Sequence, residues 1–247
     1  MDPASRPPRR PSKFGLLLLV LVVSYLLSAV ASGAWVSVVQ VALFLGIAAL
    51  AVRTAHVQRR IALLAIIVIT GGSALVGALV IAVPTTGVQG AANTWKAAVL
   101  AIAVVLIVSR VLAQPTVTVQ SIYGALSAYM IIGLMFAACY GALDKFIPGS
   151  FFANNAPGNL QTFQYFSFTT LTTLGYGDFT AAQSGGRAVA VLEAIIGQVF
   201  LATLVARLVS AFRAPRRSRA ERHARSPRPK ARATKTVNER PSARRRE

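Results

Sequence analysis

The 247-residue sequence has a single cysteine, only two histidines and only seven acidic residues. One cysteine, Cys139, excludes both an intrachain disulfide framework and a cysteine-based zinc site. The histidines, His56 and His223, belong to no Ser/His/Asp arrangement, so no catalytic group is expected. Charged residues make up 13% of the chain and hydrophobic residues 55%, which is too apolar for a soluble domain of this length. The composition therefore predicts an integral membrane protein that is not an enzyme and needs no cofactor.

Long apolar runs take the place of charge in this sequence. A membrane-spanning helix needs roughly 17 to 25 mostly apolar residues. Six segments qualify: 14–33, 35–52, 61–83, 97–113, 119–143 and 188–212. The first has an alternative interpretation as a secretory signal peptide, because Ala29-Val30-Ala31 resembles a cleavage site. Its apolar run is longer than signal peptides usually have, so we expect an all-α membrane protein with six transmembrane helices.

Basic residues are concentrated at the chain ends and in one short loop, and they give the sequence a net charge of +19. Lys and Arg are enriched in the cytoplasmic flanks of membrane helices. We therefore expect a multi-pass protein of the plasma membrane with both termini, residues 1–13 and 213–247, in the cytoplasm. The C-terminal tail is rich in basic residues and proline and has no apolar period. This pattern predicts a disordered segment that contacts anionic lipid, without specific nucleic-acid binding.

The connection between the fifth and sixth segments contains an apolar run, residues 163–171, that is too short to span the membrane. Such a run is typical of a half-helix that enters the membrane and returns, with the returning strand buried in protein or lining water. Asn159 is placed to cap this helix, and Thr172-Thr173-Leu174-Gly175-Tyr176-Gly177-Asp178 follows it. The partially negative C-terminus of the half-helix would favour a cation.

The two glycines of the returning strand have a specific use. A strand that removes water from a cation must present its carbonyl oxygens on one side, whereas an ordinary strand alternates them. Gly175 and Gly177 can take the positive φ that aligns carbonyls, and the hydroxyl of Thr173 adds a further ligand. We expect Tyr176 to point outward against the half-helix, and Asp178 to place a carboxylate at the outer mouth.

Thr173 to Gly177 resemble the selectivity filter of tetrameric potassium channels, and the longer string "YFSFTTLTTLGYGD", Tyr165 to Asp178, is similar to the pore helix and filter of that family. The resemblance implies a homotetramer in which four such loops replace the hydration shell of potassium ions. The ions would be permeant ligands held by the carbonyls of Thr173, Leu174, Gly175 and Tyr176.

The resemblance covers residues 119–212, with an outer helix, a pore helix at 160–172, the filter at 173–177 and an inner helix at 188–212. Two departures stand out. Leu174 occupies a position where the family more commonly has valine or isoleucine, and no proline follows Asp178 within the next three residues. The second departure affects the expected shape of the outer mouth.

The sixth segment contains two further candidates. Glu193 is the only acidic residue well inside an apolar segment, and such residues usually face the protein interior or a water-filled cavity. We expect Glu193 to support the filter by bonding to Thr169, Thr170 or the filter backbone; a pore-facing carboxylate and a purely structural hydrogen bond are the alternatives. Thr169 and Thr172 are the other candidate supports. Gly197 resembles the hinge glycine of the family's inner helix, with close helix packing as the alternative.

The first four segments, residues 14–113, lack the charges of a voltage sensor. A sensor needs several arginines, because each charge contributes only ~2.3 kcal/mol per 100 mV, and the fourth segment has only Arg110. We therefore expect weak or no voltage gating.

Three structural predictions concern other positions. Thr70-Gly71-Gly72-Ser73 predicts close helix packing. Trp95 is expected as an interfacial anchor, and the Arg207 side chain is expected to snorkel to the interface.

The sequence therefore predicts a potassium-selective channel that conducts passively. Three alternatives remain: a weakly selective cation channel, a regulatory channel subunit that does not conduct alone, and a potassium uptake transporter with related pore loops. Such transporters typically carry several degenerate loops in one long chain, whereas this sequence has one loop with the full signature.

Overall fold

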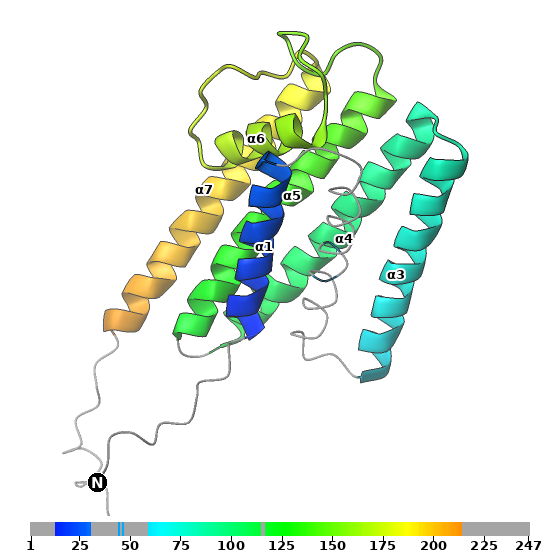
Figure 1. The fold of residues 1–247 in the computed structure, drawn as a ribbon. Helices are drawn as coiled ribbons and strands as arrows, with labels where there is room; N and C mark the ends of the chain where they lie inside the picture. The colour runs from blue at the N-terminus through cyan, green and yellow to red at the C-terminus, as the bar shows by residue number, and fades with distance from the viewer. Residues whose placement is uncertain (1–12, 31–43, 45, 47–58, 115–116, 214–247) are drawn as a thin grey trace, which may run out of the picture. The chain divides into compact units, whose positions relative to one another are not determined.

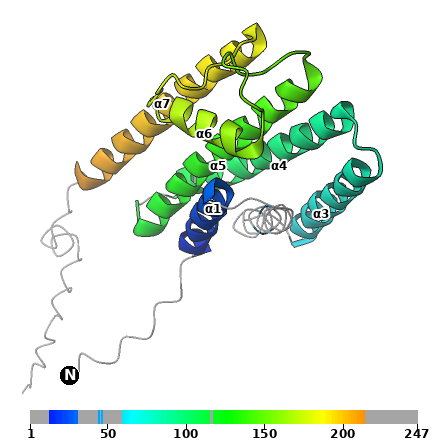
Figure 2. The ribbon, with the colours of Figure 1, turned by 45° about the horizontal axis from the view of Figure 1, so that its top comes forward.

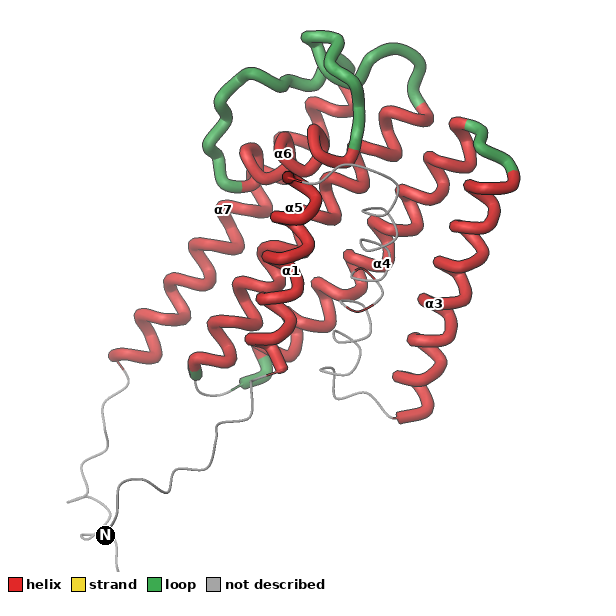
Figure 3. The backbone as a smooth tube through the Cα atoms, viewed as in Figure 1, coloured by secondary structure: helices red, strands yellow, loops and turns green. Residues whose placement is uncertain are grey.

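The structure is a computed structural model that describes residues 13–30, 44, 46, 59–114 and 117–213. The chain divides into two compact units, Met1–Phe212 and Arg213–Glu247, and the described helices lie in the first unit apart from the last residue of α7. Within the described residues the secondary structure is helical, with one isolated bridge between Phe152 and Ala181 (Figure 3). The tail from residue 214 and nearly all of the expected second span, 35–52, lie outside the described residues.

The helices are shown in Figure 1: α1 Lys13–Val30, α3 Arg59–Ala82, α4 Thr86–Leu112, α5 Val119–Phe146, α6 Leu160–Leu171 and α7 Ser184–Arg213. In the described part of the chain, four helices are long and apolar enough to cross a membrane: Leu63–Ala82, Thr86–Leu112, Val119–Phe146 and Ser184–Ser210. Phe14–Val30 forms a shorter apolar helix. An all-helical integral membrane protein is thus confirmed, whereas six crossings and a tetramer remain predictions.

Helix α4 begins at Thr86 and not at residue 97, so the predicted start of the fourth segment was wrong. Polar side chains between these positions interrupt the apolar run, but the helix accommodates them. Thr85 caps the helix by accepting a hydrogen bond from the backbone N–H of Val88 at 3.4 Å. Within the helix, Lys96 Nζ donates to Asn93 Oδ1 at 3.5 Å. Local hydrogen bonding therefore extends α4 well beyond its most apolar part.

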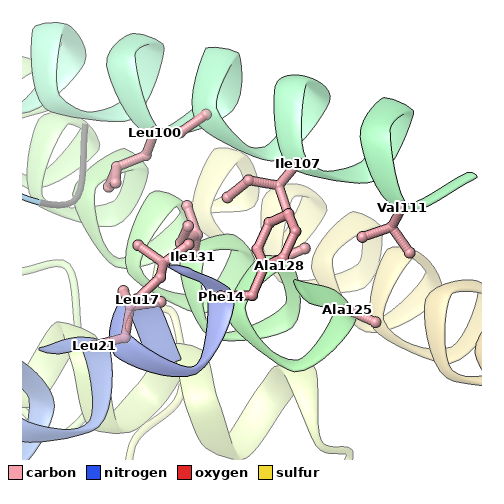
Figure 4. Packing of buried hydrophobic residues seen from close by; sticks show 10 residues of the cluster. Phe14, Leu17, Leu21, Leu100, Ile107, Val111, Ala125, Ala128 and Ile131 are labelled. Carbon is pink, nitrogen blue, oxygen red and sulfur yellow. The ribbon is translucent and has the colours of Figure 1, made fainter. Parts of the chain in front are cut away.

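Helix α5 is the central element, and it contacts α1, α4 and α6. One cluster of buried side chains joins three helices, as Figure 4 shows. It contains Phe14, Leu17 and Leu21 of α1, Leu100, Ile107 and Val111 of α4, and Ala125, Ala128 and Ile131 of α5. The two alanines of α5 let the neighbouring helices approach closely. Lipid tails are as apolar as these side chains, so the hydrophobic effect does not drive helices together in a membrane. Close van der Waals packing of this kind holds them together instead.

The contact between α3 and α4 centres on Trp95. An added Cβ at Gly72 would lie 2.3 Å from the Trp95 ring, so only glycine leaves room for this contact. The indole Nε1 also donates to the hydroxyl of Ser73 at 3.1 Å. Close helix packing at the Thr70 to Ser73 stretch is therefore as expected. The structure places Trp95 in a helix contact, and its role as an interfacial anchor remains a prediction.

The loop before α6 and the loop after the filter strand lie together at one end of α5 and α7 (Figure 2). Backbone contacts join these two loops. Besides the bridge between Phe152 and Ala181, the N–H of Ala153 donates to Thr180 O at 2.9 Å, and the N–H of Ala182 donates to Phe151 O at 2.8 Å. A cluster of buried aromatic residues lies against this crossing: Tyr140, Phe151, Phe152, Phe163 and Phe166. The crossing fixes the segment that follows the filter.

Candidate functional site

Helix α6 has the length and capping expected of a half-helix. Its 12 residues rise only about 18 Å, less than the hydrocarbon core of a bilayer. Asn159 and Thr162 form a capping box, in which Thr162 N donates to Asn159 Oδ1 at 2.9 Å and Asn159 N donates to Thr162 Oγ1 at 3.0 Å. The helix ends at Leu171, two residues before the first filter residue, Thr173.

Helix α1 contacts α6, and the sequence did not predict this contact. Ser28 and Gln164 form a buried hydrogen bond between the two helices. The ring of Tyr25 meets Phe168 edge to face, with centroids 4.8 Å apart. The first apolar segment therefore braces the half-helix.

The filter strand has positive φ at every second residue: Thr173 at 58°, Gly175 at 51° and Gly177 at 82°. The two glycines take the conformation expected from the sequence. Thr173 is the exception to local preference, because a β-branched residue in the left-handed region costs roughly 1–2 kcal/mol. Residues of positive φ therefore alternate with residues whose φ is not positive. Such alternation can turn successive carbonyls toward one side, which is the arrangement that a dehydrated cation requires.

The filter strand is attached to the end of α6 by backbone hydrogen bonds. The carbonyl of Thr169 accepts from the N–H groups of Leu174 at 2.8 Å and Gly175 at 3.1 Å. Thr173 N donates to the carbonyl of Thr170 at 2.9 Å, and its side-chain oxygen accepts from Gln198 Nε2 at 3.3 Å. These bonds explain how Thr173 is held at positive φ. Thr169 thus contacts the filter through its backbone.

Thr172 and Leu171 complete the junction between helix and filter. Thr172 follows the last residue of α6, and its hydroxyl donates back to the carbonyl of Phe168 in that helix at 2.6 Å. The carbonyl of Leu171 accepts from the hydroxyl of Tyr129 on α5 at 3.0 Å. The end of the half-helix is therefore fixed from α5 as well as from the filter.

Glu193 is fully buried behind α6 and does not face an open pore. The Tyr140 hydroxyl donates to Glu193 Oε2 at 2.5 Å, and Ser167 Oγ lies 2.5 Å from Glu193 Oε1. Ser167 belongs to α6, so Glu193 links the inner helix to the half-helix. The expected partners were Thr169, Thr170 or the filter backbone, and this part of the prediction was wrong by less than one helical turn along α6.

The bonds around Glu193 need one more hydrogen than the hydroxyl groups carry. Tyr140 donates its one hydroxyl hydrogen to Glu193. Ser167 has one hydrogen, and its Oγ bonds both to the Gly133 carbonyl at 2.7 Å and to Glu193 at 2.5 Å. A carbonyl only accepts, so Ser167 donates to Gly133, and the bond between Ser167 and Glu193 takes its hydrogen from the carboxyl group. The arrangement matches a neutral Glu193 that donates to Ser167.

Gly197 lies against the last residue of α6. An added Cβ would lie 2.4 Å from the carbonyl oxygen of Leu171 and 2.9 Å from its Cδ1. Close packing, one of the two interpretations of this glycine, is therefore present in the structure. The hinge role remains a prediction.

We expect Gly197→Ala to weaken the junction between α7 and the filter, because backbone atoms must shift to admit the methyl group. Overpacking of this kind costs about 1–3 kcal/mol. The measurement is the thermal stability of the assembled protein, with Gly185→Ala as the control. Gly185 is on the same helix, and its added Cβ would meet only Ile147 Cδ1 at 3.7 Å. Equal stability of the two variants would contradict the packing role.

Asp178 and its neighbours form the segment after the filter, where the sequence predicts the outer mouth. Asp178 Oδ1 accepts from the N–H of Phe179 at 3.1 Å, and the Asp178 carbonyl accepts from Asn154 Nδ2 at 2.8 Å. Phe179 follows Asp178 directly, and its ring packs on Phe152 and Tyr165 with centroids 5.0 and 5.6 Å apart. Ring packing and the loop crossing therefore hold this segment without the proline that tetrameric potassium channels often have there.

The filter side chains have little cover within one chain. Tyr176 was expected to pack against the half-helix, but 68% of its surface is exposed, and Leu174 is 54% exposed. One face of α7 is also exposed and apolar, at Val191, Leu192, Ile195, Val199 and Val205. Within the described residues, these side chains of the filter and of α7 are therefore left largely uncovered.

The sequence missed several polar partners of the site: Tyr129, Tyr140, Ser167 and Gln198. Each is a polar residue in an otherwise apolar segment, and that was the available signal. Which of them meets Glu193, and which meets the filter, depends on how the helices pack.

Comparison with known proteins gives one match. Residues 126–214, just over a third of the chain, match the family model described as "Ion channel". Searches of curated proteins and of solved structures found no match. The matched residues include most of α5, all of α6, the filter strand and α7. This part of the chain is an ion-channel domain, and the protein is a membrane channel, not an enzyme.

Proposed function

We propose that the protein is a potassium-selective channel that conducts ions passively across the plasma membrane. The observation that carries this proposal is the alternating positive φ at Thr173, Gly175 and Gly177, directly after a half-helix. The carbonyls of residues 173–176 and the Thr173 hydroxyl replace the water around a dehydrated ion. The C-terminal end of α6 adds a partial negative charge near the inner end of the filter.

The proposed assembly is a homotetramer, because one chain supplies one filter strand and a closed ring of carbonyls needs four. The exposed Tyr176 and Leu174 support it, since neighbouring subunits in a closed ring would cover both side chains. In this arrangement α7 lines the inner pore. Glu193, behind α6, positions the filter and does not contact the ion.

The proposed orientation places both termini in the cytoplasm, so that the helix ends near Arg110 and Arg207 face inward and the loops around Asp178 face outward. With a single arginine in α4, voltage contributes little to opening. Neither the orientation nor the selectivity determines which stimulus opens the channel.

The test is the reversal potential of current through the purified full-length protein in a planar bilayer, with potassium on one side and sodium on the other. We expect a value close to the potassium equilibrium potential. A value near zero would contradict selectivity and favour the weakly selective cation channel. Bilayers that receive detergent without protein are the control.

A further inference from the structure

A cavity of about 580 Å³ lies between α4, α5 and α7, away from the filter. Its walls are almost entirely aliphatic, and Val104 and Val108 of α4, Ala128 of α5 and Leu204 of α7 are among the residues that line it. A cavity of this kind admits a hydrocarbon chain. Its lining also includes one charged side chain, Arg207 of α7.

Arg207 is only partly satisfied by the protein. Its Nη2 donates to the carbonyls of Leu112 at 3.3 Å and Gln114 at 2.6 Å, at the end of α4. Its Nη1 is buried and, within the described residues, has no acceptor. Arg110, in the last turn of α4, likewise has a buried Nε without an acceptor in the described residues. Unpaired buried donors on charged groups are costly, so an anionic acceptor beside Arg207 would stabilise it.

The described part of the chain offers no carboxylate for this purpose, whether from the same subunit or from a second copy. Its acidic residues are Asp144, Asp178 and Glu193. Asp144 pairs with Lys145 at 2.9 Å, at the opposite end of α5, and Asp178 lies at the outer mouth. Glu193 is buried among its own partners. The described residues of a neighbouring subunit would therefore bring no carboxylate to Arg207.

We propose that this cavity binds an anionic phospholipid of the cytoplasmic leaflet, with an acyl chain between α4, α5 and α7 and the phosphate on Arg207. The phosphate offers the several acceptor oxygens that a guanidinium group pairs with best. Because Arg207 also holds the carbonyls at the end of α4, the bound lipid joins the inner end of α7 to the end of α4. The binding site depends on the proposed orientation but not on potassium selectivity.

The experiment is native mass spectrometry of the full-length assembled protein, incubated with phosphatidylglycerol or phosphatidylcholine of the same chain length. Both lipids carry a phosphate, but the choline ammonium group of phosphatidylcholine neutralises the headgroup, so we expect phosphatidylglycerol to be retained in preference. We expect Arg207→Gln to lower that preference by about tenfold or more, since hydrogen bonds to charged groups have this magnitude. The control is Arg216→Gln, which removes the same charge from the basic tail. A surface charge of this kind changes lipid attraction by no more than about fivefold.

Val108→Phe provides the second test, because it fills the cavity and leaves both arginines intact. We expect it to reduce retention of both lipids, and it also decides the question if Arg207→Gln does not assemble. Equal lipid preference in Arg207→Gln and Arg216→Gln would overturn the headgroup assignment. Unchanged retention in Val108→Phe, as when a neighbouring subunit fills the cavity, would overturn the proposal as a whole.

Discussion

Gly177→Ala is expected to abolish potassium current while leaving the protein assembled. Gly177 has φ of 82°, and an added Cβ would meet nothing within 4 Å in the chain. The methyl group therefore causes no clash in the fold, and its effect acts through the backbone. The left-handed conformation costs an L-residue with a side chain roughly 1–2 kcal/mol of conformational free energy. In the proposed tetramer this cost arises in each of the four chains. The peptide then turns its carbonyl away from the line of the others.

The measurements for this variant are single-channel current in a bilayer and the assembled size on gel filtration. The matched control is Gly87→Ala in the first turn of α4, where an added Cβ also meets nothing within 4 Å and φ is not positive. We expect the control to conduct as the original protein does. Selective current of normal size in Gly177→Ala would remove the filter assignment.

Glu193→Ala and Glu193→Gln are expected to give opposite results. Alanine leaves the hydroxyls of Tyr140 and Ser167 without their shared partner, and each buried unpaired group costs about 1–3 kcal/mol. We expect the loss of selective current together with a lower melting temperature. Glutamine keeps the pattern that a neutral carboxylic acid provides, because its carbonyl accepts from Tyr140 and its amide donates to Ser167. We expect Glu193→Gln to retain selectivity.

The readout is the reversal potential of each variant, measured beside its thermal stability. Ser167→Ala serves as the matched comparison, because it removes the same bond from the side of α6 and should resemble Glu193→Ala in direction. If Glu193→Gln lost selectivity as completely as Glu193→Ala, Glu193 would act as a charged carboxylate. The hydrogen count around Ser167 would then be wrong.

Local chemistry made the half-helix and the glycine positions predictable. Asn159 caps α6, and Gly175 and Gly177 adopt positive φ, because both features depend on a few neighbouring residues. The start of α4 was mispredicted for a related reason. A hydropathy pattern detects the apolar centre of a helix, whereas capping by Thr85 determines where the helix begins.

Contacts between distant residues could not be predicted in the same way. The hydrogen bonds from Glu193 join residues 26 and 53 positions apart, and the bond between Ser28 and Gln164 joins residues 136 apart. Each depends on which helix faces meet, and apolar helices in lipid offer many nearly equivalent faces. A buried acid in the sixth segment implied a partner, but its spacing along the chain did not identify Ser167 or Tyr140.

By itself, the sequence determined a helical membrane protein with a returning loop whose glycines can align carbonyls, because hydropathy and glycine's conformational freedom are local properties. The tertiary structure alone decided that Thr173 joins the glycines at positive φ, that Glu193 braces α6 from behind, and that Arg207 holds the end of α4. These features arise where separate helices supply the partners of a strained or charged group, and close packing selects those partners.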